Sequence, residues 1–201
     1  MGKFPFPEIL SHPNIPKPLH GVNPRTVLGR EWWDIHRREA YTKYDYHCWA
    51  CGYHKSEVPL RKNILEAHEA YDIDYMTGTV TLKEIVAVCH CCHSFIHSNR
   101  TWILYSEDEL TADEAMFVYQ RGHDILDEAK LQAFYTTEYY YRHLVLGCPH
   151  DIIIPQLYME GYMTSEMPFA SWEKWKLIIE NQEHYSLFKN EQEHNEYYSM
   201  L

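Results

Sequence analysis

The chain contains no run of about 18 apolar residues, which is the length that a membrane-spanning helix needs. Its first ten residues, MGKFPFPEIL, include two prolines and lack the apolar core of a signal peptide, so we expect no secretion signal. It also has no internal repeat and no low-complexity tract. These absences predict a protein of the cytoplasm with no membrane partner.

Positive charge is scarce in the second half of the chain. Residues 1–100 carry 12 Lys and Arg against 11 Asp and Glu, whereas residues 101–201 carry 6 against 18. An acidic surface repels the phosphate backbone of a nucleic acid. We therefore expect any nucleic acid, DNA in particular, to bind within residues 1–100, and a protein partner to meet the acidic region.

Aromatic residues are abundant, with 17 Tyr and 6 Trp, and the hydrophobic fraction of 45% is enough for a packed core. Six of the ten prolines fall within residues 1–30, which predicts an extended arm that wraps over a surface. We expect three parts: this Pro-rich arm at 1–30, a central domain at 31–100, and an acidic, aromatic-rich, mainly helical region at 101–201.

The local patterns predict an α+β protein. The centre should contain a helix at about 31–43, two strands on either side of a turn at Gly78, and a cysteine turn that leads into a short helix within CHCCHSFIHSN. Thr111 and Glu114 form a capping box that should begin another helix, with an interruption or a kink at Gly122. Farther on, DIIIPQLY is expected to be extended because of its proline, and SWEKWKLIIENQ is expected to be helical.

Five of the six cysteines lie in two tight clusters, which favours a metal site over disulfides in a chain without a secretion signal. Cys48 and Cys51 form one Cys-x-x-Cys pair, and Cys89 and Cys92 form another after 37 intervening residues. Two such pairs can supply the four soft ligands that structural zinc prefers. Cys91 could replace Cys92 as a ligand, but the spacing of the first pair favours Cys92.

The order of these motifs resembles the zinc-bearing HNH endonuclease family. The resemblance covers about residues 22–100 and rests on CWACG, LEAHE, Gly78 and EIVAVCHCCHSFIH. It is similar to a branch often found in phages and bacteria, with an NPR and WW lead-in. It implies a zinc-stabilised ββα-metal module, treble-clef-like, with one catalytic divalent metal, in a protein of the host cytoplasm if it is phage-encoded.

The resemblance implies roles for particular residues. His68 takes the place of a metal ligand, and Glu69 takes the place of the general base, where the family has a histidine; Glu69 could instead be a ligand. Glu84 stands where the family has the Asn that supports the base. His93 and His97, four residues apart, would join His68 in a three-histidine site for Mg, Mn, Ni or Zn, similar to that of nuclease colicins.

Two functions remain open from the sequence. The first is a metal-dependent endonuclease that hydrolyses phosphodiester bonds, with phosphate contacts from Arg25, Arg37, Arg38 and Arg100. The second is a zinc protein on a catalytically degenerate HNH fold that acts as a protein-binding subunit or inhibitor. The glutamates at the base and Asn positions favour the second function, whereas the three histidines favour the first. A zinc deaminase would need a His-x-Glu motif, which HEA lacks.

Overall fold

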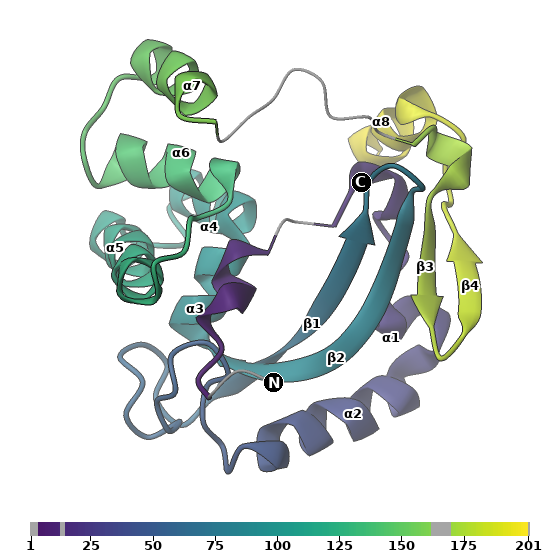
Figure 1. The fold of residues 1–201 in the computed structure, drawn as a ribbon, viewed down its shortest axis with the longest axis horizontal. Coiled ribbons are helices and arrows are strands. Elements are labelled where there is room, and N and C mark those ends of the chain that lie inside the picture. Colours follow the sequence, from purple (N-terminus) through teal and green to yellow (C-terminus); the bar gives the residue numbers. More distant parts are fainter. Residues whose placement is uncertain (1–3, 13–14, 162–169, 201) are drawn as a thin grey trace. The chain divides into compact units, whose positions relative to one another are not determined.

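The computed structural model describes residues 4–12, 15–161 and 170–200, and shows an α+β protein with a four-stranded sheet in the order β1-β2-β3-β4 (Figure 1). Within these residues no helix is long and apolar enough to cross a membrane. The elements, with 3-10 helices written η, are η1 Pro7–Ser11, η2 Lys17–Leu19, α1 Pro24–Val27, α2 Gly29–Lys43, β1 Leu65–Asp74, β2 Thr79–Cys89, α3 His90–Ile96, α4 Ser98–Ser106, α5 Ala112–Ala129, α6 Tyr135–Leu144, α7 His150–Met159, η3 Trp172–Lys174, β3 Lys176–Ile179, β4 Gln182–Tyr185 and α8 Glu191–Ser199.

The chain divides into two compact units, each assembled from three separate segments. The first unit consists of Met1–Asn14, Tyr41–His68 and Ala87–Ser165. The second unit consists of Ile15–Ala40, Glu69–Val86 and Glu166–Leu201. The three parts expected from the sequence remain a prediction, and each unit is described below by itself.

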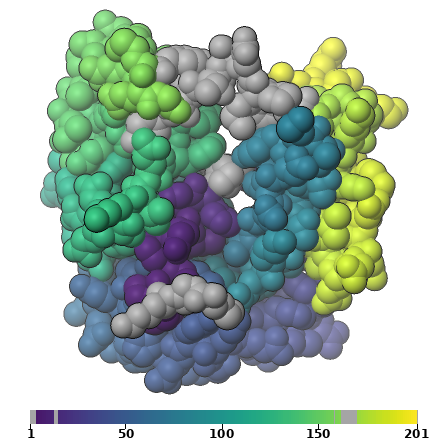
Figure 2. All heavy atoms as spheres, viewed as in Figure 1, coloured from purple at the N-terminus to yellow at the C-terminus, as the bar shows by residue number. Residues whose placement is uncertain are grey.

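In the first unit, helix α5 is the central element and packs against α3, α4, α6 and η1, while α7 packs on α6 (Figures 1 and 2). A capping box between Thr111 and Glu114 begins α5, as the sequence predicts. The expected interruption at Gly122 is wrong, because α5 continues to Ala129. A Cβ at Gly122 would lie 2.1 Å from Cδ2 of Phe95, so glycine permits the close approach of α5 to α3.

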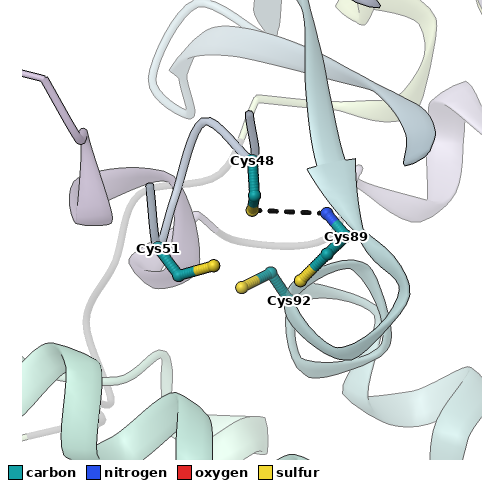
Figure 3. Close-up of side chains that lie close together, drawn as sticks. All are labelled: Cys48, Cys51, Cys89 and Cys92. Carbon is teal, nitrogen blue, oxygen red and sulfur yellow. Dashed lines mark hydrogen bonds between the residues drawn. The ribbon is translucent and has the colours of Figure 1, made fainter. Parts of the chain in front are cut away.

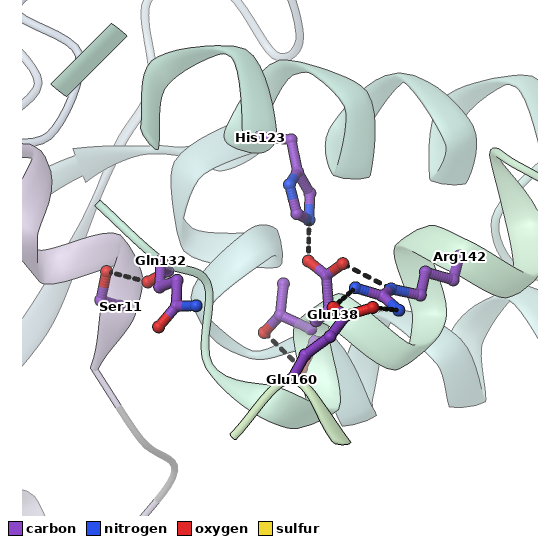
Figure 4. Close-up of polar contacts among 8 residues, drawn as sticks. Ser11, His123, Gln132, Glu138, Arg142 and Glu160 are labelled. Carbon is purple, nitrogen blue, oxygen red and sulfur yellow. Dashed lines mark hydrogen bonds and ion pairs between the residues drawn. The ribbon is translucent and has the colours of Figure 1, made fainter. Parts of the chain in front are cut away.

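A charged network joins three helices of this unit (Figure 4). Glu138 on α6 lies 2.7 Å from Nε of Arg142 and 3.3 Å from Nε2 of His123 on α5. The guanidinium of Arg142 also binds both carboxylate oxygens of Glu160, just beyond α7. Glu138 is buried, and its ion pair with Arg142 compensates much of the cost of that burial.

The segment DIIIPQLY belongs to helix α7, so the expectation of an extended piece is wrong. Ile153 and Leu157, one helical turn apart, are both fully buried. Their packing outweighs the single backbone hydrogen bond that Pro155 removes from the helix.

The second unit is built around the sheet. The first three residues of β2 pair in parallel with β3, and β3 pairs antiparallel with β4. A core of six buried side chains covers this end of the sheet: Leu19, Val22, Val80, Trp175, Leu177 and Ile179. The turn between β1 and β2 is fixed by Asp74, whose carboxylate accepts hydrogen bonds from the backbone N–H groups of Met76 and Thr77.

The predicted helix at SWEKWKLIIENQ is also wrong, because this segment forms η3 followed by strand β3. Trp175, Leu177 and Ile179 are buried at every second position, which is the period of a strand. Glu180 and Asn181 both have positive φ, as the two central residues of a type I′ hairpin turn do, and this turn leads into β4.

The predicted central elements are otherwise confirmed: the helix expected at 31–43 is α2, the two strands are β1 and β2, and the short helix is α3. The Pro-rich arm is not uniformly extended, since it contains η1, η2 and α1. Pro at the first or second position begins each of these short helices, where the missing N–H costs nothing.

Candidate metal centre

Four cysteines converge in the first unit (Figure 3). The sulfurs of Cys48, Cys51, Cys89 and Cys92 all lie within 4.8 Å of one another. Cys48 and Cys51 lie on the loop after α2, Cys89 ends β2, and Cys92 lies in the first turn of α3. The structure therefore selects Cys92 over Cys91 as the fourth member of the group.

The local backbone explains why the first pair of cysteines adopts this arrangement. Gly52 has φ +74°, a conformation that favours glycine, and its N–H donates to the carbonyl of Cys48 at 2.8 Å. The N–H of Cys48 in turn donates to the carbonyl of Tyr53 at 2.8 Å. These bonds close a tight loop that directs both side chains to the same side.

The four cysteines fit a zinc ion. Ligand sulfurs about 2.3 Å from a tetrahedral zinc lie about 3.8 Å apart, which agrees with their grouping here. The N–H of Cys89 donates to the sulfur of Cys48 at 3.3 Å, a contact that stabilises a thiolate. Hydrogen bonds from the other three cysteines, with Cys48 first, hold the pKa of Cys51 well below its usual range. The donor set can therefore bind a metal ion such as zinc.

Three histidines form a second group in the same unit. The ligand nitrogens of His68, His93 and His97 lie within 4.8 Å of one another. The ring of His68 lies 5.4 Å from that of His93 and 5.0 Å from that of His97, and the latter two are 4.6 Å apart. The N–H of His97 donates to the carbonyl of His93, so the last turn of α3 sets their helical spacing.

The buried histidine of this group has an unsatisfied nitrogen. His68 is 6% exposed, and its Nδ1 has no hydrogen-bond partner among the residues that the structure describes. A buried polar atom without a partner costs free energy unless something binds it. The free Nδ1 and the two neighbouring imidazoles therefore fit a divalent metal, which prefers such nitrogen ligands.

Glu66 holds two histidines in place and was not singled out by the sequence analysis. Its carboxylate lies 2.6 Å from Nδ1 of His90 and 2.5 Å from Nδ1 of His93. With Nδ1 of His93 donating to this carboxylate, Nε2 is left as the ligand atom. The two-residue period of β1 places Glu66 and His68 on one face, and this alternation is the signal that could have identified Glu66.

Burial and neighbouring groups set the protonation states of His68, His97 and Glu66. Burial, and then the charges of His97 and His93, lower the pKa of His68 well below its usual value. Burial also lowers the pKa of His97 to about 4, with a further contribution from His93. Burial works to raise the pKa of Glu66, but the hydrogen bonds from His90 and His93 outweigh it and lower this pKa. At neutral pH His68 and His97 are therefore neutral, the form that binds a metal.

The other predicted catalytic residues lie outside this group. Glu69 follows His68 in an uninterrupted strand, so its side chain leaves the opposite face, on the side of Tyr71. Burial, and then the charge of Glu69, raise the pKa of Tyr71, which agrees with this placement. Glu84 is half-buried on β2. Catalytic roles for these two glutamates remain predictions.

The predicted phosphate-binding arginines fall in both units. Arg100, exposed on α4 in the first unit, is near enough to His97 for its charge to lower the pKa of that histidine, after the larger effects of burial and His93. Arg25 and Arg38 are exposed on α1 and α2 in the second unit. Arg37 forms an ion pair with Asp34 at 2.7 Å, so its charge is partly neutralised within α2. Nucleic-acid contacts by these residues remain predictions.

Comparison with known proteins gives no relative for the chain: no family model, no curated protein and no solved structure matches it.

Proposed function

We propose that this protein is a metal-dependent endonuclease of the HNH type, which hydrolyses phosphodiester bonds of nucleic acid, DNA in particular. The observation that carries this proposal is the group of His68, His93 and His97, with the Nδ1 of His68 buried and unpaired among the described residues. Three imidazole ligands leave room for further ligands on a divalent metal.

The supporting residues have separate roles in this proposal. A divalent metal, when bound, would act as a Lewis acid toward a phosphate oxygen. Glu66 fixes the ring of His93 through Nδ1 and thereby presents its other nitrogen to the centre. The four cysteines would hold a structural zinc that fixes α3, the helix that begins beside Cys89 and carries His93.

The zinc-stabilised ββα arrangement is part of the same proposal. β1, β2 and α3 follow one another along the chain, with His68 on the first strand and His93 on the helix. This order is the one that a ββα-metal module requires. Arg100, whose charge acts on His97, would contact a substrate phosphate.

A plasmid nicking assay tests this function. Wild type, His68→Ala and His93→Ala would be compared in Mg, Mn, Ni and Zn, with His150→Ala as a matched control because His150 is exposed on α7. We expect nicking by wild type and His150→Ala, and a loss of at least about 100-fold in the other two. Equal activity in all four proteins would exclude this function for the three-histidine group.

The position of Glu69 favours a second candidate, a catalytically degenerate HNH-fold zinc protein that binds another protein through its acidic region. A base on the strand that carries His68 should face the same side as that histidine, but the regular strand directs Glu69 to the opposite face. Metal analysis separates the candidates: one zinc per chain, with no second divalent metal after equilibration with Mn or Ni, supports the binding protein.

A further inference from the structure

One of the four clustered cysteines differs from the others in its exposure. Cys48, Cys89 and Cys92 are buried at 0%, 0% and 2% exposure, whereas Cys51 is only partly buried. Cys51 also lines a cavity of about 400 Å³, together with residues of the Pro-rich arm, the loop that carries Cys48 and Cys51, and α5. Of the four clustered cysteines, Cys51 is therefore the one that this cavity reaches.

The cavity brings Arg121 of α5 to the same place as Cys51. Its guanidinium lies 4.7 Å from the centre of the Tyr53 ring, and Tyr53 follows Cys51 by two residues in the same loop. Nε of Arg121 is buried and has no hydrogen-bond partner among the described residues. Because this arginine lines the cavity and has a buried donor without a partner, its positive charge favours an anion there.

The position of Arg121 is fixed by the packing of its helix. The next residue, Gly122, lies in direct contact with the ring of Phe95 on α3. Because α3 carries Cys92, the distance between Arg121 and the cysteine group depends on this contact rather than on a flexible loop. Four thiolates around a divalent zinc carry a net charge of −2, and Arg121 is a suitable counter-charge.

The charges that line the cavity do not favour contact with a nucleic acid. Asp124 and Glu128, on the same helix as Arg121, are exposed and also line it. Their carboxylates would repel a polyanion. The remaining walls are mainly apolar, with Pro5, Pro7 and Ile125 among them. The cavity therefore suits a small molecule with at most one negative charge.

We propose that Cys51 is a modification site, the thiolate of the four-cysteine centre that small thiol-directed electrophiles reach through this cavity, and that Arg121 governs their selection by charge. With an alkyl iodide, the sulfur of Cys51 forms a bond to carbon while the carbon–iodine bond breaks, and iodide leaves with the electron pair. The thioether that results is a much weaker metal ligand than a thiolate, so modification releases the metal. The metal-release part of this inference rests on the proposed zinc site.

The test uses the full chain with Cys148→Ser, which removes the other partly exposed cysteine. The protein is treated with iodoacetamide, which is neutral, or with iodoacetate, which is an anion. Mass spectrometry identifies the modified cysteines over time, and a chromophoric chelator measures released zinc. We expect Cys51 to react first with both reagents, with zinc released at the rate of its modification. Modification of Cys48, Cys89 or Cys92 at the same rate would overturn the site.

Arg121→Gln and Arg121→Lys test the role of the charge. One positive charge about 6 Å away in water changes the local concentration of a monovalent anion about threefold. We therefore expect Arg121→Gln to lower the ratio of the iodoacetate rate to the iodoacetamide rate at Cys51 about threefold. Arg121→Lys should keep the ratio, because it keeps the charge. A change of both rates by the same factor in Arg121→Gln would show a structural effect and overturn this role.

The outcomes also separate this inference from the proposed zinc site. Protein that contains no zinc as purified, yet reacts first at Cys51, contradicts the zinc site and the metal-release step but supports the modification site. Protein that contains zinc and reacts first elsewhere contradicts the modification site alone. Circular dichroism of each variant before labelling confirms that the rates are measured on folded protein.

Discussion

The carboxylate of Glu66 and the imidazole of His93 meet at 2.5 Å between Oε2 and Nδ1, and the other oxygen of the same carboxylate lies 2.6 Å from His90. One side chain on β1 thus orients two side chains on α3. A carboxylate that accepts from a ligand imidazole fixes the tautomer and the direction of the ring.

Glu66→Gln should weaken metal binding at the three histidines. A glutamine has one carbonyl oxygen in place of two carboxylate oxygens, so it cannot accept from both His90 and His93. We expect the affinity for Ni or Zn to fall about 10- to 100-fold, measured by isothermal titration calorimetry. The matched control is Glu69→Gln on the opposite face of the same strand. An equal loss in the control would indicate that Glu69 is a ligand.

His68→Ala should abolish metal binding at the three histidines and leave the zinc at the four cysteines. The four cysteines do not include His68, so one zinc per chain should remain, while the metal taken up in excess Ni or Mn should disappear. Elemental analysis after gel filtration measures both. Retention of two metals by this variant would contradict the three-histidine centre.

Cys89→Ser should destabilise the first unit severely. Cys89 is itself fully buried, and loss of one ligand of a structural zinc removes binding energy that supports folding. We expect far-ultraviolet circular dichroism to show lost helix and a chelator to give the same spectrum in wild type. Cys148→Ser is the control, since Cys148 lies outside the group, and its spectrum should match that of wild type. A folded, zinc-free Cys89→Ser protein would contradict a structural role for the metal.

Gly122→Ala should destabilise the protein although alanine favours helices. The added Cβ would lie 2.1 Å from Cδ2 of Phe95, whose side chain is fully buried and cannot move away freely. Overpacking of this kind costs about 1–3 kcal/mol, more than the helix propensity that alanine gains. Urea unfolding measures the difference, with Glu128→Ala on the exposed face of α5 as control. Increased stability of Gly122→Ala would show that Phe95 repacks.

The pair of His20 and His194 should make stability depend on pH. Nδ1 of His20 lies 3.0 Å from Nε2 of His194, and burial followed by the charge of His194 lowers the pKa of His20 in the folded state. Between this pKa and the unfolded value near 6.5, the unfolded chain binds more protons. The contribution of His20 to stability is therefore complete above pH 6.5 and is lost as the pH falls toward its folded pKa.

His20→Phe should flatten this dependence. Urea unfolding of wild type and variant at pH 7.5, 6.5 and 5.5 gives the slope of stability against pH, and the wild-type slope should be the steeper one. The comparison cancels acid effects common to both proteins, such as protonation of the cysteine and histidine groups. Identical slopes would show that His20 has the same pKa in both states.

The sequence predicts the central segment of the chain well because local sequence patterns determine its structure. The two Cys-x-x-Cys pairs, the period-two strand around His68 and the helical spacing of His93 and His97 are local patterns, and the structure brings each set together. Glu66 was overlooked because its role depends on contact with α3, which lies 24 residues farther along the chain. Its position on the face of His68 could have been obtained from strand alternation.

The second half is less predictable because packing overrides local preference there. Pro155 suggested an extended segment, but burial of Ile153 and Leu157 stabilises a helix. Trp172 and Trp175 suggested helical spacing, but Trp175, Leu177 and Ile179 are buried at alternate positions and β3 pairs with β2. Gly122 suggested a break because the residue that requires it, Phe95, belongs to another helix.

Cys92 and His93 are consecutive residues, yet one belongs to the cysteine group and the other to the histidine group. A single peptide bond at the start of α3 therefore connects the two candidate centres. Metal lost from the cysteines would therefore loosen the turn that orients His93. Zinc would then bind at the cysteines before the second metal binds at the histidines. The amount of zinc available in the cell would therefore limit binding of the second metal.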